Sequence, residues 1–588
     1  MFVVATAGHV DHGKSTLVRL LTGMEPDRWA EERRRGMTID LGFAWTGLPT
    51  GETVAFVDVP GHERFVANML AGVGPVPAVM FVVAADEGWK AQSAEHLGAL
   101  DALGVRHGLL VVTRSDLADP AAAQAQAQAE IAATTLGSVP AVCVSGRTGK
   151  GLDDLRLALH LLVAALAPSS VDSDVRLWVD RAFTIKGAGT VVTGTLPAGQ
   201  LHVGQELVVA GSGQRVVVRG LQSLGETVPR LTATARVAAN LRGVALDDVR
   251  RGDALLTPQR WLTTSLLDVR LRGDSAADLP GELALHIGSA AVTARVRPLG
   301  ADTARLSLNR ALPLRVGDVA VLRDPGRRKI AAGATVLDIR PPALRRRGAG
   351  AVRAAVLSDM DGTPDGLAEV RRRGIIKAGD LRAMGATPPG APVAGDWLVD
   401  DTLRADLSAH LVAATTRYAA AHPLEQGAPV EVLRRELRLP DVRLVAALVR
   451  PPLALHEGRV LPADTGPALP ADVQRAVDAV RQDLTVAPYA APDANRLAEL
   501  GLRAKQLGAA VRAGALLKVA DGVFLLPGAD ESAAGLLAGL PQPFTLSEAR
   551  QALGTSRRVA VPLLELLERQ GRTVRLADSR HTVAPRLT

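Results

Sequence analysis

The residues from Gly8 to Ser15 constrain the fold of this chain more than any other part of the sequence. They read G-H-V-D-H-G-K-S and match the pattern G-x-x-x-x-G-K-[ST] in full. The β-branched run 2–7 precedes them and the apolar run 17–21 follows, so a strand, a loop and a helix are predicted in that order. Glycines in such a loop let backbone N–H groups surround a phosphate at a helix N-terminus. The motif therefore predicts a nucleotide-binding α/β domain.

Several side chains of this loop have expected roles in a nucleotide site. Lys14 is expected to reach the β- and γ-phosphates, and Ser15 is expected to ligate Mg²⁺. The predicted nucleotide contacts in the loop are Asp11, His12, Gly13, Lys14, Ser15 and Thr16.

A second motif, D-V-P-G-H at residues 58–62, comes directly after an apolar strand. Asp58 is expected to hold Mg²⁺, through water, and the backbone N–H of Gly61 can sense the γ-phosphate. His62 then lies where a side chain must orient the attacking water, so we predict that it is the catalytic residue. In isolation, a surface histidine in a turn would be the simpler interpretation, but the neighbouring phosphate loop favours hydrolysis.

Between these motifs lies R-G-M-T-I-D at residues 35–40. The hydroxyl of Thr38 can complete the Mg²⁺ shell only when GTP is bound, which would couple nucleotide state to loop order. We interpret the charged run 31–35 as a solvated switch segment rather than an RNA-binding patch.

The base-reading motif departs from the common pattern. Many GTPases carry Asn-Lys-x-Asp after a buried strand, whereas here residues 109–112 lead into Thr113-Arg114-Ser115-Asp116. Asp116 is expected to accept the N1 and N2 hydrogens of guanine. Thr113 stands where asparagine is usual, so part of the loop bracing and ring stacking has to be met differently. Ser145 and Gly146 follow the last predicted strand and are expected to contact the guanine oxygen.

The length of 588 residues predicts about four domains. Strands expected at 2–7, 53–57, 79–84, 109–113 and 141–144 alternate with helical segments, which is typical of a parallel sheet covered by helices. From 175 to about 339, short strands punctuated by glycine predict two β-barrels. Beyond them, a helix–helix–strand pattern recurs at about 60-residue spacing and resembles winged helices. We thus expect a multidomain chain: an α/β P-loop GTPase domain (1–170), β-barrels (171–258 and 259–340), then tandem winged helices (341–399 with a linker, 400–466, 467–529 and 530–588).

Composition and charge limit the kinds of partner and site that the chain can have. Basic residues exceed acidic ones by 68 − 61 = 7, which permits a nucleic-acid partner without proving one. One cysteine excludes internal disulfides and cysteine metal sites. The longest apolar stretch, 73–85, contains two prolines and is shorter than the ~20 residues of a membrane-spanning helix. With no targeting segment and no oligomerisation signal visible, we expect a cytoplasmic monomer with no membrane partner.

The strings at 8–15, 35–40 and 58–65, together with Ala85-Asp86-Glu87-Gly88, resemble the elongation factor Tu class of translational GTPases. Within that class the chain resembles the selenocysteine-specific elongation factors of the SelB type. The run Thr38 to Ala44 (T-I-D-L-G-F-A) is characteristic of that family, and the base-reading loop of some members also starts with threonine. The chain also continues for about 250 residues beyond the barrels, where elongation factor Tu would stop.

The resemblance implies a function and partners. Such a factor binds GTP/GDP and Mg²⁺, hydrolyses GTP and delivers selenocysteinyl-tRNA to ribosomes at recoded UGA codons, guided by an mRNA hairpin. The family's proposed selenocysteine pocket maps onto Asp180, Arg181 and Arg236. Cationic neighbours suit a selenol, because it is ionised at neutral pH while the hydroxyl of serine is not. The alternative is that Asp180 and Arg181 form an ion pair on the barrel surface that contributes little.

The hairpin-binding helix of the family carries a serine–basic–basic string, which here is Ser556-Arg557-Arg558. We expect Pro562 in the first turn of a helix, Gly571 at its end, and a β-wing at 573–576 and 581–583. Arginines at a helix start and a wing suit RNA phosphates and an exposed loop base, although such a face is often only solvated. The predicted RNA-binding residues are Arg557, Arg558, Arg572 and Arg575.

Two other hypotheses remain open from the sequence. The chain could be a different translation-factor GTPase of the elongation factor Tu type with an unrelated RNA-binding extension. It could also be a nucleotide-dependent RNA-binding scaffold whose hydrolysis is incidental. The predicted winged helices favour the selenocysteine-specific factor over the first, and the presence of His62, Thr38 and Ser15 favours an active hydrolase over the second.

Overall fold

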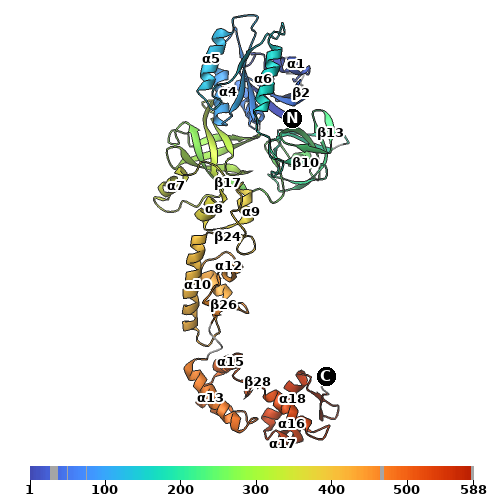
Figure 1. Cartoon of the computed structure of the whole chain (residues 1–588), viewed down its shortest axis with the longest axis vertical. Helices are drawn as coiled ribbons and strands as arrows, with labels where there is room; N and C mark the ends of the chain where they lie inside the picture. Colours follow the sequence, from blue (N-terminus) through green and yellow to red (C-terminus); the bar gives the residue numbers. More distant parts are fainter. Residues whose placement is uncertain (27–37, 50, 75, 188, 464–468, 585–588) are drawn as a thin grey trace. The chain divides into compact units, whose positions relative to one another are not determined.

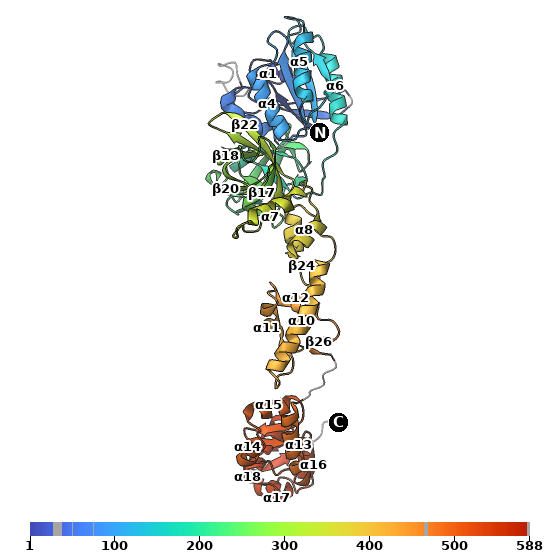
Figure 2. The same ribbon diagram turned by 90° about the vertical axis from the view of Figure 1, so that its left-hand side faces the viewer.

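The computed structural model describes residues 1–26, 38–49, 51–74, 76–187, 189–463 and 469–584. The chain forms two compact units (Figures 1 and 2): the first comprises Met1–Arg372 and Lys377–Gly390, and the second comprises Arg373–Ile376 and Ala391–Thr588. The charged run 31–35 and the first half of the 35–40 motif lie outside the described residues, so their interpretation stays a prediction.

The N-terminal domain contains a six-stranded sheet in the order β2-β3-β1-β4-β5-β6. The five strands predicted from the sequence are confirmed, and they pair in parallel. The sequence analysis missed β2, which runs antiparallel to β3 at the sheet edge. The strands are β1 (Phe2–Ala7), β2 (Gly42–Gly47), β3 (Thr53–Asp58), β4 (Ala78–Ala84), β5 (His107–Thr113) and β6 (Ala141–Cys143).

Helices cover both faces of this sheet (Figure 1). Successive residues of a strand point to opposite faces, so Val3 and Val4 belong to different apolar clusters. Helices α1 (Lys14–Thr22) and α6 (Leu152–Ala164) pack on the face of Val4. The face of Val3 is covered by α3 (Val66–Val73), α4 (Ala91–Ala102) and α5 (Ala121–Ala132). Burial on both sides explains why the strands read as continuous apolar runs.

Two antiparallel β domains follow. The first has the strand order β7-β16-β11-β12-β15-β9-β8, with β13 paired to β12 and a separate β10–β14 pair, around its own apolar core. The second is a closed barrel in the order β17-β20-β19-β18-β21-β22. The strands of the first are β7 (Arg176–Trp178), β8 (Arg181–Ile185), β9 (Gly189–Leu196), β10 (Gln200–His202), β11 (Glu206–Val209), β12 (Arg215–Ser223), β13 (Glu226–Val228), β14 (Arg230–Thr232), β15 (Ala235–Arg242) and β16 (Ala254–Leu256). Those of the second are β17 (Thr263–Gly273), β18 (Glu282–Ile287), β19 (Ala290–Pro298), β20 (Thr303–Pro313), β21 (Val319–Asp324) and β22 (Lys329–Asp338).

The C-terminal part repeats one pattern, three helices followed by a two-stranded hairpin, to which β25 (Ala428–Pro429) adds a third strand in the first repeat. Between the barrel and these repeats lie α7 (Ala349–Ser358), α8 (Gly366–Arg373), β23 (Ile375–Lys377), α9 (Ala378–Ala383) and β24 (Trp397–Val399). The repeats are α10 (Asp401–Ala421), α11 (Val430–Glu436) and α12 (Val442–Leu448) with β26 (Leu453–His456) and β27 (Arg459–Pro462); α13 (Ala471–Val486), α14 (Ala494–Glu499) and α15 (Ala504–Arg512) with β28 (Leu517–Ala520) and β29 (Val523–Leu525); and α16 (Ala529–Ala538), α17 (Leu546–Ala552) and α18 (Arg557–Arg569) with β30 (Thr573–Arg575) and β31 (His581–Val583). The domain boundaries stay predictions.

One local prediction in the last repeat is wrong. Helix α18 begins at Arg557, so Pro562 lies inside the helix rather than in its first turn. The predicted end at Gly571 and the predicted wing are confirmed by the helix bounds and by the pairing of β30 with β31. The earlier start places both Arg557 and Arg558 in the first turn of α18.

Over the described residues, every helix is too short or too polar to cross a lipid bilayer.

Candidate functional site

The predicted phosphate loop connects β1 to α1 with a backbone suited to an anion. Gly13 is the N-cap of α1 in the left-handed conformation, and Gly8 also has a positive φ. Lys14 is buried, and its Nζ donates to the carbonyls of Gly8 (3.1 Å) and His9 (2.7 Å). Gly61 packs so closely that a Cβ there would lie 2.6 Å from Lys14 Nζ and 2.6 Å from the backbone nitrogen of Val10. The second motif therefore lies against the first, beside the ammonium of Lys14 and the backbone of Val10.

The three predicted Mg²⁺ ligands come together beside this loop. Ser15 Oγ donates to Asp58 Oδ2 at 2.6 Å and lies 3.0 Å from Thr38 Oγ1. Thr6 Oγ1 donates to the other carboxylate oxygen of Asp58 at 2.7 Å, which fixes the orientation of the group. Two hydroxyls and a carboxylate form the oxygen-only donor set that Mg²⁺ prefers.

His62 follows Gly61 and is the N-cap of the short 3₁₀ helix η1 (Glu63–Phe65). Its Nδ1 accepts a hydrogen bond from the backbone N–H of Arg64 at 3.2 Å, and its side chain is half-buried. This contact assigns the acceptor role to Nδ1 and leaves Nε2 to face away from the cap.

A cavity of about 390 Å³ lies next to the loop, where a guanine base would sit. Ser145 Oγ donates to Asp116 Oδ1 at 2.7 Å, and Arg147 Nε lies 3.1 Å from Asp116 Oδ2. The hydrogen bond from Ser145, assisted by the charge of Arg147, holds the pKa of Asp116 below its usual range, so the carboxylate can accept two guanine hydrogens. Of the predicted nucleotide contacts, this cavity is lined by Asp11, Gly13, Thr16, Thr113, Asp116 and Gly146.

The substituted residues of the base-reading loop make two connections to the phosphate loop. Thr113 Oγ1 donates to the carbonyl of His12 at 2.7 Å. The guanidinium of Arg114 donates to the carbonyl of Asp11 and forms ion pairs with Asp86 (3.0 Å) and Glu87 (2.7 Å). The bracing that asparagine and lysine usually supply is therefore present in a different form.

The side chain of His12 faces the protein interior, so only its backbone is placed to serve a nucleotide. Burial, with the nearby His9 and Lys14, lowers the pKa of His12 to about 4. Two side chains of helix α4 hold the backbone of the phosphate loop. His96 Nδ1 accepts a hydrogen bond from the N–H of Gly8 at 3.1 Å, and Gln92 Oε1 accepts one from the N–H of Val10 at 3.3 Å. Burial and Lys14 lower the pKa of His96 to about 3, so it remains a neutral acceptor. The sequence analysis missed Gln92 and His96, because polar residues on a helix carry no local sign of such a contact.

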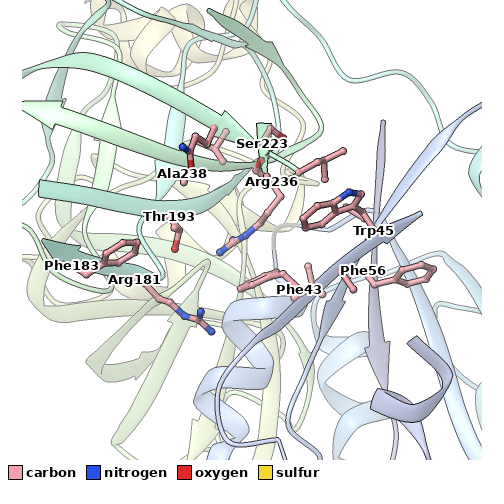
Figure 3. A pocket seen from close by; sticks show the side chains of 16 residues that line it. Phe43, Trp45, Phe56, Arg181, Phe183, Thr193, Ser223, Arg236 and Ala238 are labelled. Atoms are coloured by element: carbon pink, nitrogen blue, oxygen red, sulfur yellow. Dashed lines mark hydrogen bonds between the residues drawn. The ribbon is translucent and has the colours of Figure 1, made fainter. Parts of the chain in front are cut away.

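A second cavity, of about 320 Å³, lies between strands β2 and β3 of the nucleotide domain and strands β8, β9, β12 and β15 of the next domain. Figure 3 shows Arg181, Phe183, Thr193 and Arg236 reaching it from one domain, and Phe43 and Trp45 from the other. Two of the three residues predicted for a selenocysteine pocket, Arg181 and Arg236, line this cavity.

The third predicted residue, Asp180, is buried behind Arg236. The guanidinium of Arg236 pairs with both carboxylate oxygens of Asp180, and Thr193 Oγ1 donates to Oδ1 at 2.6 Å. Burial alone would raise the pKa of Asp180, but the charge and hydrogen bonds of Arg236 and the hydrogen bond of Thr193 keep the pKa below its usual range. The alternative, a surface ion pair between Asp180 and Arg181, is wrong, because the buried Asp180 pairs with Arg236 and Arg181 pairs with Asp40 instead.

The sequence analysis missed the aromatic wall of this cavity. The Cζ atom of Arg236 lies 3.8 Å from the ring centroid of Phe43, and that of Arg181 lies 5.3 Å from it. Such cation–π contacts hold the two guanidinium groups near one aromatic ring. Phe43 belongs to a run that was used only as a family signature, and nothing local indicated that it contacts residues about 140 and 190 positions away.

The four arginines predicted to bind RNA fall into two pairs. Arg557 in the first turn of α18 and Arg575 in β30 are exposed, and neither forms an ion pair with another described residue. Arg558 instead donates to the carbonyls of Ala491, Pro492 (3.2 Å) and Gly522 (3.1 Å). Arg572 pairs with Glu531 at 2.8 Å. Arg558 thus ties α18 to the preceding repeat within the second unit.

Family models match four segments of the chain. Residues 1–165 match the elongation factor Tu GTP binding domain, and residues 189–256 match elongation factor Tu domain 2. Residues 268–343 match the β-barrel domain of the selenocysteine-specific elongation factor, and residues 536–582 match the winged helix of elongation factor SelB. The predicted fold class of a P-loop GTPase domain, β-barrels and C-terminal winged helices is confirmed.

Whole-chain relatives agree with these segments. The selenocysteine-specific elongation factor of Desulfomicrobium baculatum is 31% identical over 633 aligned positions, covering 98% of this chain and 99% of that protein. The Escherichia coli (strain K12) protein of the same name is 35% identical over 76% of this chain and 75% of its own length. A crystal structure of a bacterial selenocysteine-specific elongation factor, EF-Sec, has the same fold, with a TM-score of 0.76 and 24% identity over 99% of this chain and 100% of that one. The chain therefore belongs to the selenocysteine-specific elongation factors, a family of GTP- and GDP-binding translational GTPases in the elongation factor Tu class.

Proposed function

We propose that this protein carries selenocysteinyl-tRNA to the ribosome at recoded UGA codons, guided by an mRNA hairpin, and that GTP hydrolysis drives release of the cargo. The observation that carries the proposal is the cavity in which Arg181 and Arg236 face the same space beside Phe43. The names of the two relatives from Desulfomicrobium baculatum and Escherichia coli support the same cargo.

The chemistry of the cavity suits a selenolate. Asp180 and Thr193 fix Arg236 from behind, so its guanidinium is presented in one orientation. A selenol is ionised at neutral pH, a thiol with a pKa near 8.5 is mostly neutral, and a hydroxyl is not ionised at all. Two guanidinium groups therefore favour selenocysteine over cysteine and serine, and an uncharged cargo would leave them without an anionic partner.

The nucleotide would bind along the loop from Asp11 to Thr16, with Lys14 at the β- and γ-phosphates and Asp116 at the guanine edge. Ser15, Thr38 and Asp58 would hold Mg²⁺, which neutralises charge that develops on the phosphate oxygens. His62 would orient the attacking water, with Nδ1 occupied by the backbone and Nε2 available. Thr113, Ser145, Gly146 and Gly61 complete the proposed contacts.

The last winged helix would bind the mRNA hairpin. The exposed Arg557 and Arg575 are the first candidates for phosphate and base contacts, and Arg558 and Arg572 are supporting candidates because they already have protein partners. We further propose that the protein acts as a monomer on the ribosome, in the cytoplasm.

The test measures how well the protein protects aminoacyl-tRNA from spontaneous deacylation. Selenocysteinyl-, cysteinyl- and seryl-tRNA are compared in the presence of GTP and then of GDP. We expect strong protection of the selenocysteinyl form alone, and only with GTP. Equal protection of all three, or protection of none, would leave a translational GTPase with a different cargo.

A pair of matched variants ties the result to the cavity. Arg236→Ala should abolish the selective protection, because it removes the charge that faces the selenolate. Arg215→Ala removes an arginine from an exposed ion pair with Glu206 in the same domain and should have no effect.

A further inference from the structure

The short segment from Thr38 to Phe43 contacts the nucleotide site at one end and the amino-acid cavity at the other. At the nucleotide end, Thr38 Oγ1 lies 3.0 Å from Ser15 Oγ, which in turn donates to Asp58. The carbonyl of the next residue, Ile39, accepts a hydrogen bond from Asn68 Nδ2 of α3 at 2.8 Å. The segment is thus anchored to the residues expected to surround Mg²⁺ and the γ-phosphate.

At the cavity end, the same segment holds Arg181 by three contacts. Asp40 Oδ2 lies 2.9 Å from Arg181 Nε, and the carbonyl of Leu41 accepts from Arg181 Nη2. The ring of Phe43 lies under the guanidinium, as described above. Only one residue separates Thr38 from Asp40, and a two-residue stretch of backbone spans at most about 7 Å. A change in the position of Thr38 cannot leave Asp40 unaffected over so short a connection.

The local charge balance makes Asp40 important to Arg181. Asp180 is already paired with Arg236, and Arg251 adds another cation 3.7 Å from Asp40 Oδ1. The side chains of Asp40 and Arg181 are 23% and 21% exposed, so their attraction is only partly screened by solvent. Without Asp40 at this position, Arg181 would face Arg236 and Arg251 with no close carboxylate of its own.

We infer that Asp40 is a positioning residue through which the bound nucleotide controls the amino-acid cavity. With GTP, Thr38 is held at the nucleotide, and Asp40 and Leu41 present Arg181 to the cargo. With GDP, Thr38 loses that anchor, and Arg181 loses two of its contacts together. The inference rests on the proposed function for the identity of the cargo, but the coupling between Thr38 and Arg181 does not depend on it.

The first test compares the dissociation constants of selenocysteinyl-tRNA in the presence of a non-hydrolysable GTP analogue and of GDP. We expect Asp40→Asn to reduce the ratio of the dissociation constant with GDP to that with the GTP analogue by at least about fivefold. Because the coupling is reciprocal, the preference for the GTP analogue over GDP that bound tRNA confers should fall by the same factor. Asp40→Glu keeps the charge and should retain part of the ratio. In an Arg181→Ala background, adding Asp40→Asn should change the ratio no further.

The control is Glu206→Gln, which makes the same chemical change in an exposed ion pair of the neighbouring domain. It should leave the ratio unchanged. An unaltered ratio in Asp40→Asn, or additive effects in the double variant, would overturn the inference.

The second test needs no tRNA, so it separates the inference from the proposed cargo. Amide hydrogen exchange of β8 (Arg181–Ile185) is measured with the GTP analogue and with GDP. We expect slower exchange with the analogue in the wild-type chain and no such difference in Asp40→Asn. A wild-type chain without a nucleotide-dependent difference would overturn the coupling even if tRNA binding is selective. A clear difference with no selectivity for selenocysteinyl-tRNA would support the coupling and contradict only the cargo.

Discussion

The base-reading loop shows how two substituted residues keep a function by different contacts. Thr113 is shorter than asparagine, yet its hydroxyl reaches the phosphate loop at the carbonyl of His12. Arg114 is longer than lysine and branched, so it reaches the carbonyl of Asp11 and the carboxylates of Asp86 and Glu87 at once. One guanidinium group therefore connects the base-reading loop to the phosphate loop and to residues 86–87.

This connection predicts the behaviour of Arg114→Ala. Loss of the guanidinium should speed GDP dissociation by about tenfold, because charge-assisted hydrogen bonds contribute about 1.5–3 kcal/mol each and only part of that acts on the nucleotide. The rate can be measured with a fluorescent GDP analogue. Arg156→Ala removes a surface arginine paired with Asp153 in the same domain, and its rate should match the wild type. Equal rates in the two variants would show that Arg114 does not brace the site.

A second prediction at this scale concerns His62. Substitution by alanine should slow single-turnover GTP hydrolysis on the ribosome by about 10² or more, because the attacking water loses its orienting group. Nucleotide affinity should change little, since no other predicted contact depends on the imidazole. His202→Ala, at an exposed position of the next domain, is the matched control. Unchanged hydrolysis in His62→Ala would transfer the catalytic role to another residue.

Helix α18 and its wing carry arginines of two kinds, some without and some with a protein partner among the described residues. Adjacent arginines in one helical turn point about 100° apart, and although both are exposed, it is Arg558 that donates to carbonyls of the preceding repeat. The basic pair thus contributes one candidate for RNA and one contact between repeats.

The two arginines should therefore respond differently to substitution. Arg557→Ala and Arg575→Ala should each weaken binding of the mRNA hairpin. In a plot of the logarithm of affinity against the logarithm of salt concentration, each substitution should reduce the magnitude of the slope by about 1. Arg558→Ala should leave three carbonyls without a donor and lower the unfolding temperature of the second unit. Filter binding over a salt series, with calorimetry, distinguishes the two effects. A larger loss of salt dependence in Arg558→Ala would reverse the assignment.

At the level of the whole molecule, the chain has two compact units with separate apolar cores. A ligand that binds only the native state of one unit stabilises that unit by mass action. Calorimetry should therefore resolve at least two unfolding transitions. GDP with Mg²⁺ should raise the midpoint temperature only of the transition that belongs to the first unit. A single transition that GDP shifts as a whole would indicate that the two units unfold together.

The GDP-sensitive transition should also depend on pH. The folded-state pKa values of His12 and His96, about 4 and about 3, lie below the ordinary value of 6.5. Below pH 6.5 the unfolded chain binds protons that the folded chain does not, so stability is complete above that pH and declines as the pH falls. The loss approaches about 1.4 kcal/mol for each histidine per pH unit. The midpoint temperature of the GDP-sensitive transition should be lower at about pH 5.5 than at about pH 7.5, and His96→Asn should make this difference smaller. A transition independent of pH would show that the two histidines titrate normally.

Much of the nucleotide site could be predicted from the sequence. The loop from Gly8 to Ser15, Asp58 with His62, and the five parallel strands were all found, because each depends on neighbours in the chain. A strand buried on both faces must be continuously apolar, and a loop that surrounds phosphate needs glycine at positions with positive φ. The family resemblance then added the cavity residues Arg181 and Arg236, together with Asp180 behind Arg236, which no local pattern identifies.

The tertiary structure alone decided how these pieces meet. Strand β2 and the residues just before it bring Phe43 and Asp40 to arginines about 140 and 190 positions later in the chain. No periodicity of the sequence indicates a contact across two domains. The same holds for His96 under the phosphate loop and for Arg558 against the preceding repeat. The sequence by itself determined which groups are available and which local elements carry them, because covalent geometry and hydrophobic periodicity act over short distances. The packing of separate elements determined which of those groups face a ligand and which face the protein, because that depends on contacts between residues far apart in the chain.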